Sequence, residues 1–227
     1  MDDSLVAIHL EDFNTTFNVQ KALLCSASDY FVKALEGPFK ESTARTLRLP
    51  GCKQDVFQLF LYWLVHKKLP VKLNQSECII GTFVKDGEVP AQQLATVRLW
   101  MFAEEHLMPK LQNEAIRYFT GLTTKFPVDV GAVKEAFTVL PEGARIRQAL
   151  VNQMAMCYLC NSYTEAEADS LAAVPGVMRS VLEKLECCLS NRGIDMTDMT
   201  VCRHDFSCLG FFLCDDDLSR YWVNEGN

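Results

Sequence analysis

The sequence has no extended run of basic residues and no long apolar run. Its longest stretch of consecutive lysines and arginines is Lys67-Lys68, and its formal net charge is −7. Because nucleic-acid binding depends on basic side chains that meet phosphates, this composition argues against a nucleic-acid partner. The longest apolar run, residues 59–65, is far too short to cross a bilayer, so we expect no membrane partner either.

A basic start followed by an apolar stretch, which marks a secretory signal, is also missing. The amino-terminal segment instead contains Asp2, Asp3, Glu11 and Asp12. We therefore expect a cytoplasmic and/or nuclear protein. In a reducing compartment, the ten cysteines are expected to be mostly free thiols that pack as small core residues.

Histidine is scarce, with four in the whole chain. A serine nucleophile needs a histidine within reach and an oxyanion hole. Ser26 and Ser28 stand near Cys25 and Asp29, but no G-x-S-x-G turn surrounds them. We therefore predict that the protein is not an enzyme.

Cysteines near the carboxy terminus raise the question of a zinc site. Zinc needs four soft ligands that converge tetrahedrally. The candidate ligands are Cys187 or Cys188, Cys202, His204 and Cys208. The spacing of these candidates fits no standard zinc finger. Cys157 and Cys160 have the C-x2-C spacing of many zinc ligands, but within a helix that spacing places both on one face, which suits core packing equally well. We expect no metal and no cofactor.

Alternating apolar residues predict a β-hairpin over residues 5–10 and 15–19, with turn residues between them. Two short helices follow, KALLCSA and SDYFVKALEG. Ser28 or Asp29 is placed to cap the second one before Gly37-Pro38 ends it.

The rest of the chain is predicted to be mainly helical. A brief strand at 46–49 precedes a helix over 52–68, whose apolar face includes Phe60 and Trp63. A long connection spans residues 68–90. Further helices are expected from residues 91 and 109 onward and over 129–139, 143–161 and 177–189.

The order of these segments in the first half resembles that of the BTB/POZ domain. The family pattern runs F-x-V-H-K-x-x-L, S-x-Y-F, F-x-E-S, x-L-x-L and V-F-x-x-F-L-x-W-L-Y. The matching residues are Phe17, Val19, Lys21, Leu24, Ser28, Tyr30, Phe31, Phe39, Glu41, Ser42, Leu47, Leu49, Val56, Phe57, Phe60, Leu61, Trp63 and Leu64. The segment LWMFAEEHLMPKLQNEAI resembles the helix pair that ends many such domains, especially short fungal-type ones. The family histidine before the lysine is Gln20 here.

The resemblance implies an α+β fold, in which a small BTB/POZ-like sheet covered by helices precedes an all-α carboxy-terminal extension. We predict a domain over residues 4–120 with its core motif at 4–71, a helical extension over 121–190 and a cysteine-containing tail over 191–227. Few residues precede the first strand, and the amino-terminal elements that many animal members exchange between subunits are missing here. We therefore expect a weak homodimer at most.

The resemblance also implies protein partners. One hypothesis is an adaptor that docks on the cullin scaffold of a ubiquitin ligase while the extension holds a substrate. The alternatives are an oligomerisation or transcription-linked scaffold that binds no cullin and, ranked third, a metal-binding regulatory protein.

Phe39, Lys40 and Glu41 are the candidate protein-binding residues. In family members that recruit a cullin, an apolar residue, any residue and a glutamate occupy the exposed loop after this helix. An apolar anchor fills a pocket and a neighbouring carboxylate orients the contact. Alternatively, Phe39 packs on its own domain and Glu41 is a solvated charge.

Overall fold

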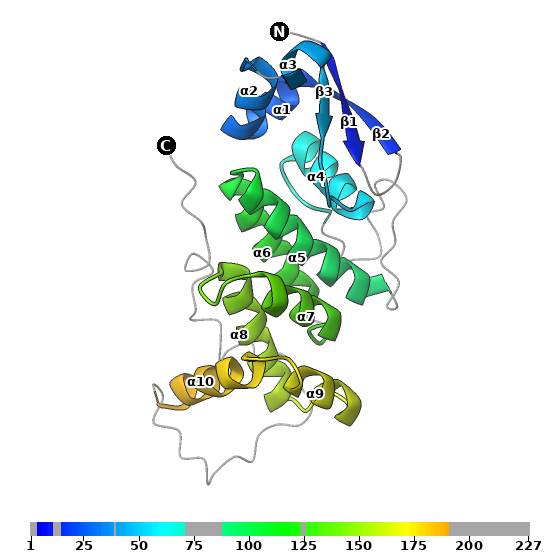
Figure 1. Ribbon diagram of the computed structural model, residues 1–227. Coiled ribbons are helices and arrows are strands. Elements are labelled where there is room, and N and C mark those ends of the chain that lie inside the picture. The colour runs from blue at the N-terminus through cyan, green and yellow to red at the C-terminus, as the bar shows by residue number, and fades with distance from the viewer. Residues whose placement is uncertain (1–3, 11–14, 39, 71–87, 124–125, 191–227) are drawn as a thin grey trace. The chain divides into compact units, whose positions relative to one another are not determined.

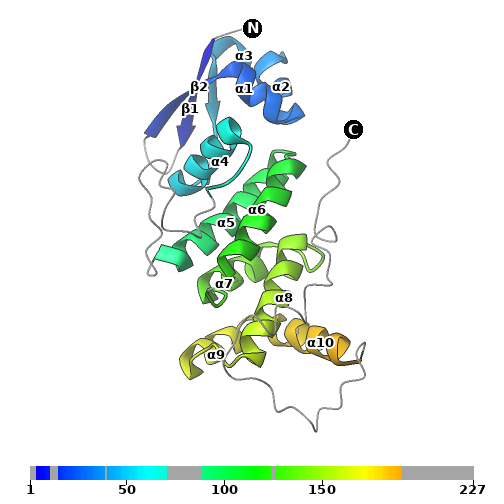
Figure 2. The same cartoon turned by 180° about the vertical axis from the view of Figure 1, so that it is seen from behind.

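Figures 1 and 2 show the computed structural model of the protein, which describes residues 4–10, 15–38, 40–70, 88–123 and 126–190. The elements in chain order are β1 (Leu5–Leu10), β2 (Thr15–Gln20), α1 (Lys21–Ala27), α2 (Asp29–Glu36), α3 (Lys40–Ala44), β3 (Thr46–Arg48), α4 (Gln54–His66), α5 (Val89–Glu105), α6 (Pro109–Thr123), α7 (Val130–Val139), α8 (Arg145–Leu159), α9 (Glu165–Ala172) and α10 (Val177–Ser190). A small sheet followed by helices confirms the predicted α+β fold class.

The chain divides into two compact units. Among the described residues, the first unit comprises 4–70 and 98–115, and the second comprises 88–97 and 116–190. The predicted domain boundary near residue 120 stays a prediction.

The first unit contains a three-stranded sheet with the strand order β2-β1-β3. β1 pairs with β2 in antiparallel register, with Ile8 opposite Phe17, and with β3 in parallel register, with Ile8 opposite Leu47. The inward residues Val6, Ile8 and Leu10 are buried, whereas Leu5 on the outer face is exposed. The predicted hairpin and its alternation are confirmed.

Helices α1 to α3 connect β2 to β3, as Figure 1 shows. The Phe31 backbone N–H donates a hydrogen bond of 3.5 Å to the Ser28 hydroxyl, so Ser28 caps α2 as predicted. At the other end of α2, the Gly37 backbone N–H donates to the Lys33 carbonyl. The capped helix buries Phe31 and Leu35 in the core of the first unit.

Aromatic rings fill that core. Phe60 of α4 is completely buried, and its ring centroid lies 5.9 Å from that of Phe31, 5.2 Å from that of Phe102 and 6.3 Å from that of Trp63. Phe57 packs against the same ring at 5.7 Å. The helix face predicted from Phe60 and Trp63 is therefore the buried face.

In the second unit, α8 packs against α7 and α10, and α7 also contacts α9. Asp129 caps α7 by accepting a hydrogen bond of 2.8 Å from the Ala132 backbone N–H. Thr164 and Glu167 form a reciprocal capping box at the start of α9. Within the described ranges, no helix combines the length and apolar character that a membrane span requires.

Two helices were not expected from the sequence. α9 falls in a segment for which no separate helix is predicted, although Thr164 and Glu167 carry the capping-box signal. α3 corrects the prediction of an exposed loop after Gly37-Pro38, because the chain turns into a helix at Lys40. The five residues of α3 contain neither glycine nor proline, and Arg45 ends them with a left-handed φ of 49°.

Candidate protein-binding site

The structure describes only part of the predicted Phe39-Lys40-Glu41 site. Phe39 lies outside the described residues, as does the side chain of Lys40. Lys40 is the first residue of α3, and Glu41 lies in the first turn of that helix, where it is half-buried. An acidic side chain in a first helical turn faces the positive end of the backbone dipoles.

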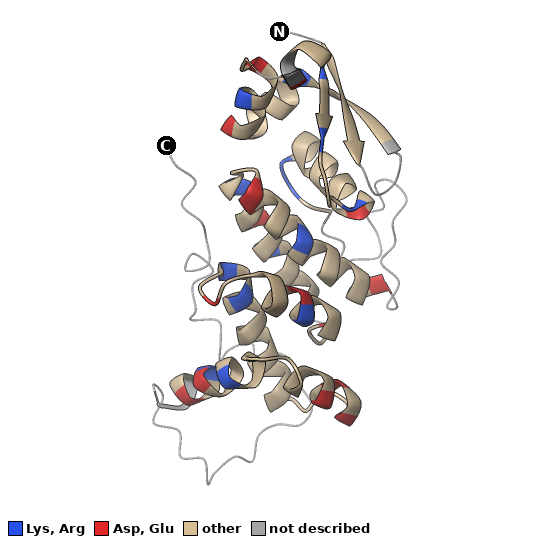
Figure 3. Ribbon diagram, in the orientation of Figure 1, with Lys and Arg blue, Asp and Glu red and all other residues tan. Residues whose placement is uncertain are grey.

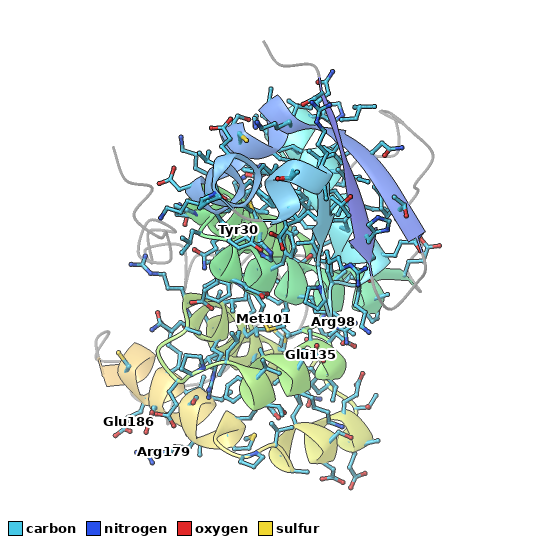
Figure 4. The ribbon with its side chains drawn as sticks, turned by 45° about the horizontal axis from the view of Figure 1, so that its top comes forward. Tyr30, Arg98, Met101, Glu135, Arg179 and Glu186 are labelled. Carbon is cyan, nitrogen blue, oxygen red and sulfur yellow. The ribbon has the colours of Figure 1, made fainter. Side chains whose placement is uncertain are left out.

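The carboxylate of Glu41 makes no hydrogen bond or ion pair with any described residue. The negative charge of Glu41 acts on the hydroxyl of Tyr30 in α2, a half-buried residue that Figure 4 labels. Burial raises the pKa of the Tyr30 hydroxyl, and the negative charges of Glu105 and Glu41 raise it further. Tyr30 therefore keeps its proton near neutral pH and can donate a hydrogen bond beside two carboxylates.

Helix α2 carries charges of both signs. Figure 3 shows acidic and basic residues along α2, where Asp29 and Lys33 lie on the first and second turns. At its end, Glu36 forms an ion pair with Lys21 of α1 at 3.4 Å. Helix α2, which precedes α3, thus carries charges of both signs, and charges at the rim of an interface mainly orient a contact.

The ring of His106 packs against the rings of Tyr30 and Phe102 in the core of the first unit. Its ring centroid lies 4.6 Å from that of Tyr30 in an edge-on arrangement and 4.1 Å from that of Phe102. Its Nδ1 atom lies 2.8 Å from the Phe102 carbonyl oxygen, to which it can donate as the N–H tautomer. Burial lowers the pKa of His106, opposed by that hydrogen bond and by the charge of Glu105, so the neutral imidazole is favoured.

We expect the protein to lose stability as the pH falls from about 7.5 to about 6, partly because of His106. The folded state holds the pKa of His106 below its ordinary value of 6.5, so the unfolded chain binds more protons in this window. This contribution is present above the unfolded pKa and is lost as the pH falls toward the folded pKa. A difference of one proton gives a slope of at most about 1.4 kcal/mol per pH unit.

Urea denaturation of the wild type and His106→Asn at several pH values measures this slope. The asparagine amide can still donate to the Phe102 carbonyl, but it does not titrate. The variant should be less stable at pH 7.5 and should show a shallower decline. Parallel declines for both proteins would contradict the assignment to His106.

Comparison with known proteins identifies the first part of the chain. Residues 3–82 match the family model of the BTB/POZ domain. The chain contains a BTB/POZ domain. The hairpin, α1 to α4 and β3 all lie inside the matched range, whereas α5 to α10 lie outside it. No curated protein matches the chain.

BTB/POZ domains are protein–protein interaction modules, so this protein carries such a module. The serines near Cys25 have structural roles within it. The Ser26 hydroxyl donates a hydrogen bond of 2.7 Å to the Leu23 carbonyl, and the Ser28 hydroxyl accepts from the backbone of α2. Both hydroxyls thus form hydrogen bonds with the backbone of the BTB/POZ domain, and for Ser28 this is the cap that the sequence predicts.

The cysteines of α8 and of the predicted zinc site have different outcomes. Cys157 of α8 is buried and Cys160 is half-buried, and both are free thiols whose pKa is raised chiefly by burial. Such thiols are inert packing residues. Of the zinc candidates, Cys202, His204 and Cys208 lie outside the described residues. Among the residues that are described, no three acidic, cysteine or histidine side chains gather to hold a metal.

Proposed function

We propose that this protein is a non-enzymatic adaptor whose BTB/POZ domain recruits a partner to a cullin-type ubiquitin ligase. The observation that supports this proposal is the position of Glu41, which is half-buried in the first turn of α3, pairs with no described residue and follows Phe39 and Lys40 in the chain. In this proposal its carboxylate contacts another protein. The helical extension holds the client in this proposal, in the cytoplasm and/or the nucleus.

Phe39 and Glu41 have different roles in the proposed contact. Phe39 is the apolar anchor that fills a pocket on the cullin, since buried aromatic side chains dominate the energy of most interfaces. Glu41 is the charge that orients the docked surface, because charges at the rim of an interface act mainly on specificity and association rate. Lys40 lies between them and contributes a second charge.

The alternative is an oligomerisation or transcription-linked scaffold that binds no cullin. The exposed Leu5 on the outer face of the sheet favours it, because its side chain keeps 54% of its surface accessible in the isolated chain. We propose that such self-association is at most weak. A pull-down with the amino-terminal domain of a cullin separates the two functions.

We expect Phe39→Ala to weaken cullin binding by roughly thirtyfold, the equivalent of about 2 kcal/mol for a truncated anchor. Glu41→Lys should weaken binding less, and its effect should shrink at high salt, because screening reduces the contribution of exposed charges. Thr43→Ala, which changes an exposed residue of the same helix, is the matched control and should leave binding unchanged. Calorimetric titration with the cullin domain measures all three.

Thermal denaturation of the same variants separates a binding residue from a core residue. All three should melt within a few degrees of the wild type. A strong loss of thermal stability in Phe39→Ala with intact cullin binding would make Phe39 a core residue. A wild type that never binds a cullin would leave the scaffold function as the better description.

A further inference from the structure

Strand β2 leaves one edge of the sheet open. The strand order β2-β1-β3 places β2 on the outside, and no described strand pairs with its side away from β1. Figures 1 and 2 show β2 as an outer strand from both sides. Thr16 and Asn18 are exposed along this strand. An open edge carries backbone N–H and C=O groups that can pair with a further strand.

The direction of the backbone groups follows from the pairing of β1. The Ala7 backbone N–H donates a hydrogen bond of 2.9 Å to the Arg45 carbonyl, on the β3 side of β1. The His9 carbonyl accepts one of 3.0 Å from the Leu49 backbone N–H, on the same side. Successive residues of a strand face opposite sides with their backbone groups, so Ile8, between these two residues, faces β2.

The same alternation applies to β2. Ile8 is opposite Phe17, so the backbone groups of Phe17 face β1. The backbone groups of Thr16 and Asn18, on either side of Phe17, consequently point out of the open edge. Among the described residues, no other backbone group forms a hydrogen bond with them across that edge. The edge therefore offers two donors and two acceptors in a row.

β2 also lacks the features that usually protect an edge. Natural sheets place a lysine, a proline, a bulge or a very short strand there. β2 has six residues, TTFNVQ, with no charged residue, proline or glycine among them. Its register against β1 runs from Leu5–Gln20 to Leu10–Thr15 without a bulge. The strand is therefore long and regular enough to accept another strand.

We propose that the open edge of β2 pairs with β2 of a second copy of this chain, in antiparallel orientation and with Phe17 opposite the partner's Phe17. A two-fold axis brings identical edges together in this orientation. Thr16 then exchanges two hydrogen bonds with the partner's Asn18, and Asn18 exchanges two with the partner's Thr16. The contact joins two three-stranded sheets into one. It uses no residue of the proposed cullin site, so it goes beyond the proposed function and holds whether or not a cullin binds.

The side chains of β2 suit this self-pairing. Thr16 and the partner's Asn18 lie opposite each other on the outer face, and neither carries a charge that could repel its copy. On the inner face, Phe17 is half-buried, with its ring centroid 4.9 Å from that of Phe57. The uncovered part of the Phe17 ring meets the same ring of the partner, and aromatic pairs directly across two strands are favourable.

We expect the dimer to be weak for two reasons. Each copy carries a formal net charge of −7, which opposes close approach. A contact through one pair of strands is also smaller than the roughly 1,200 Å² of standard interfaces, so we expect a dissociation constant of about 10⁻⁵–10⁻³ M.

Amide hydrogen exchange on the full chain, followed by nuclear magnetic resonance at about 20 μM and about 1 mM, locates the contact. We expect exchange of the Thr16 and Asn18 backbone amides to slow by about twofold to sixfold at the higher concentration, since only the dimer pairs them. The Phe17 amide faces β1 in both states and is the internal control. Exchange at Thr16 and Asn18 that does not depend on concentration would overturn the proposal.

Sedimentation equilibrium with two double variants tests the register. In Thr16→Lys/Asn18→Asp, each new lysine lies opposite a new aspartate of the partner, and we expect dimerisation to tighten by about twofold to thirtyfold. In Thr16→Lys/Asn18→Lys, lysines lie opposite lysines, and dimerisation should weaken by a similar factor or more. The second variant adds two positive charges to a net charge of −7, so a change in general repulsion alone would strengthen its association.

Both double variants should melt within a few degrees of the wild type, because Thr16 and Asn18 are exposed. Equal association of the two variants would overturn the proposal and would mean that the copies meet through another surface. A wild type that stays monomeric at about 1 mM would also overturn it. An extended strand of another protein would then be the better occupant of the edge.

Discussion

Phe60→Ala is expected to lower the free energy of unfolding by about 3–5 kcal/mol, the usual cost of truncating a buried aromatic ring. Phe60 has no exposed surface, and its ring contacts Phe31, Phe57, Trp63 and Phe102. These contacts come from three helices, so the neighbouring rings cannot close the cavity without moving backbone.

Urea denaturation measures this loss, and Val65→Ala provides the control. Val65 lies on the same helix but is 64% exposed, so its truncation should change the free energy of unfolding by about 0.5 kcal/mol or less. Similar midpoints for Phe60→Ala and the wild type would mean that α4 packs through another face. A large loss in Val65→Ala would lead to the same conclusion.

Gln93→Leu should destabilise the protein by about 2–4 kcal/mol through a different mechanism, the loss of two hydrogen bonds by one buried side chain. Gln93 is 1% exposed, and its Nε2 atom donates to the Pro127 carbonyl at 2.9 Å. Its Oε1 atom accepts from the Asp129 backbone N–H at 2.7 Å. Leucine fills the space but leaves both backbone groups without this partner, just before the start of α7.

Gln153→Leu is the matched control for this change, because Gln153 is half-buried and forms no hydrogen bond among the described residues. It should be close to neutral in thermal and urea denaturation. Hydrogen exchange adds a local readout, since the backbone amides at the start of α7 should lose protection in Gln93→Leu. Intact protection there together with wild-type stability would show that the two hydrogen bonds contribute little.

The sequence predicts the elements whose signals are local. Alternation of apolar residues identifies β1 and β2, Ser28 identifies the start of α2, and the spacing of Phe60 and Trp63 identifies the buried face of α4. Each signal depends on residues within one or two turns of one another. These elements are also the ones that carry the BTB/POZ resemblance.

Other features lack such a signal. α3 has five residues, too few for a periodic pattern, and Leu171 is the buried residue of α9, so α9 has no apolar stripe. The contact between Tyr30 and His106 joins residues far apart in the chain, so spacing within a helix cannot reveal it. Arg147 and Asn152 are polar residue types that suggest exposure, yet the structure buries both among the apolar core residues of α8.

The parallel pairing of β1 with β3 has a consequence for the order of folding. Forming the β1–β2 hairpin closes only a short loop. Pairing of Ala7 with Thr46 instead closes a much longer loop, which contains β2 and α1 to α3. Loop-closure entropy makes such non-local pairing slow relative to hairpin formation and helix growth. The three residues of β3 gain little from pairing alone, so we expect collapse of α1 to α3 to precede the pairing of β3 with β1. We therefore expect the sheet to be completed late in folding. Until then one edge of β1 is unpaired, and it could form backbone hydrogen bonds with a strand of another unfolded chain.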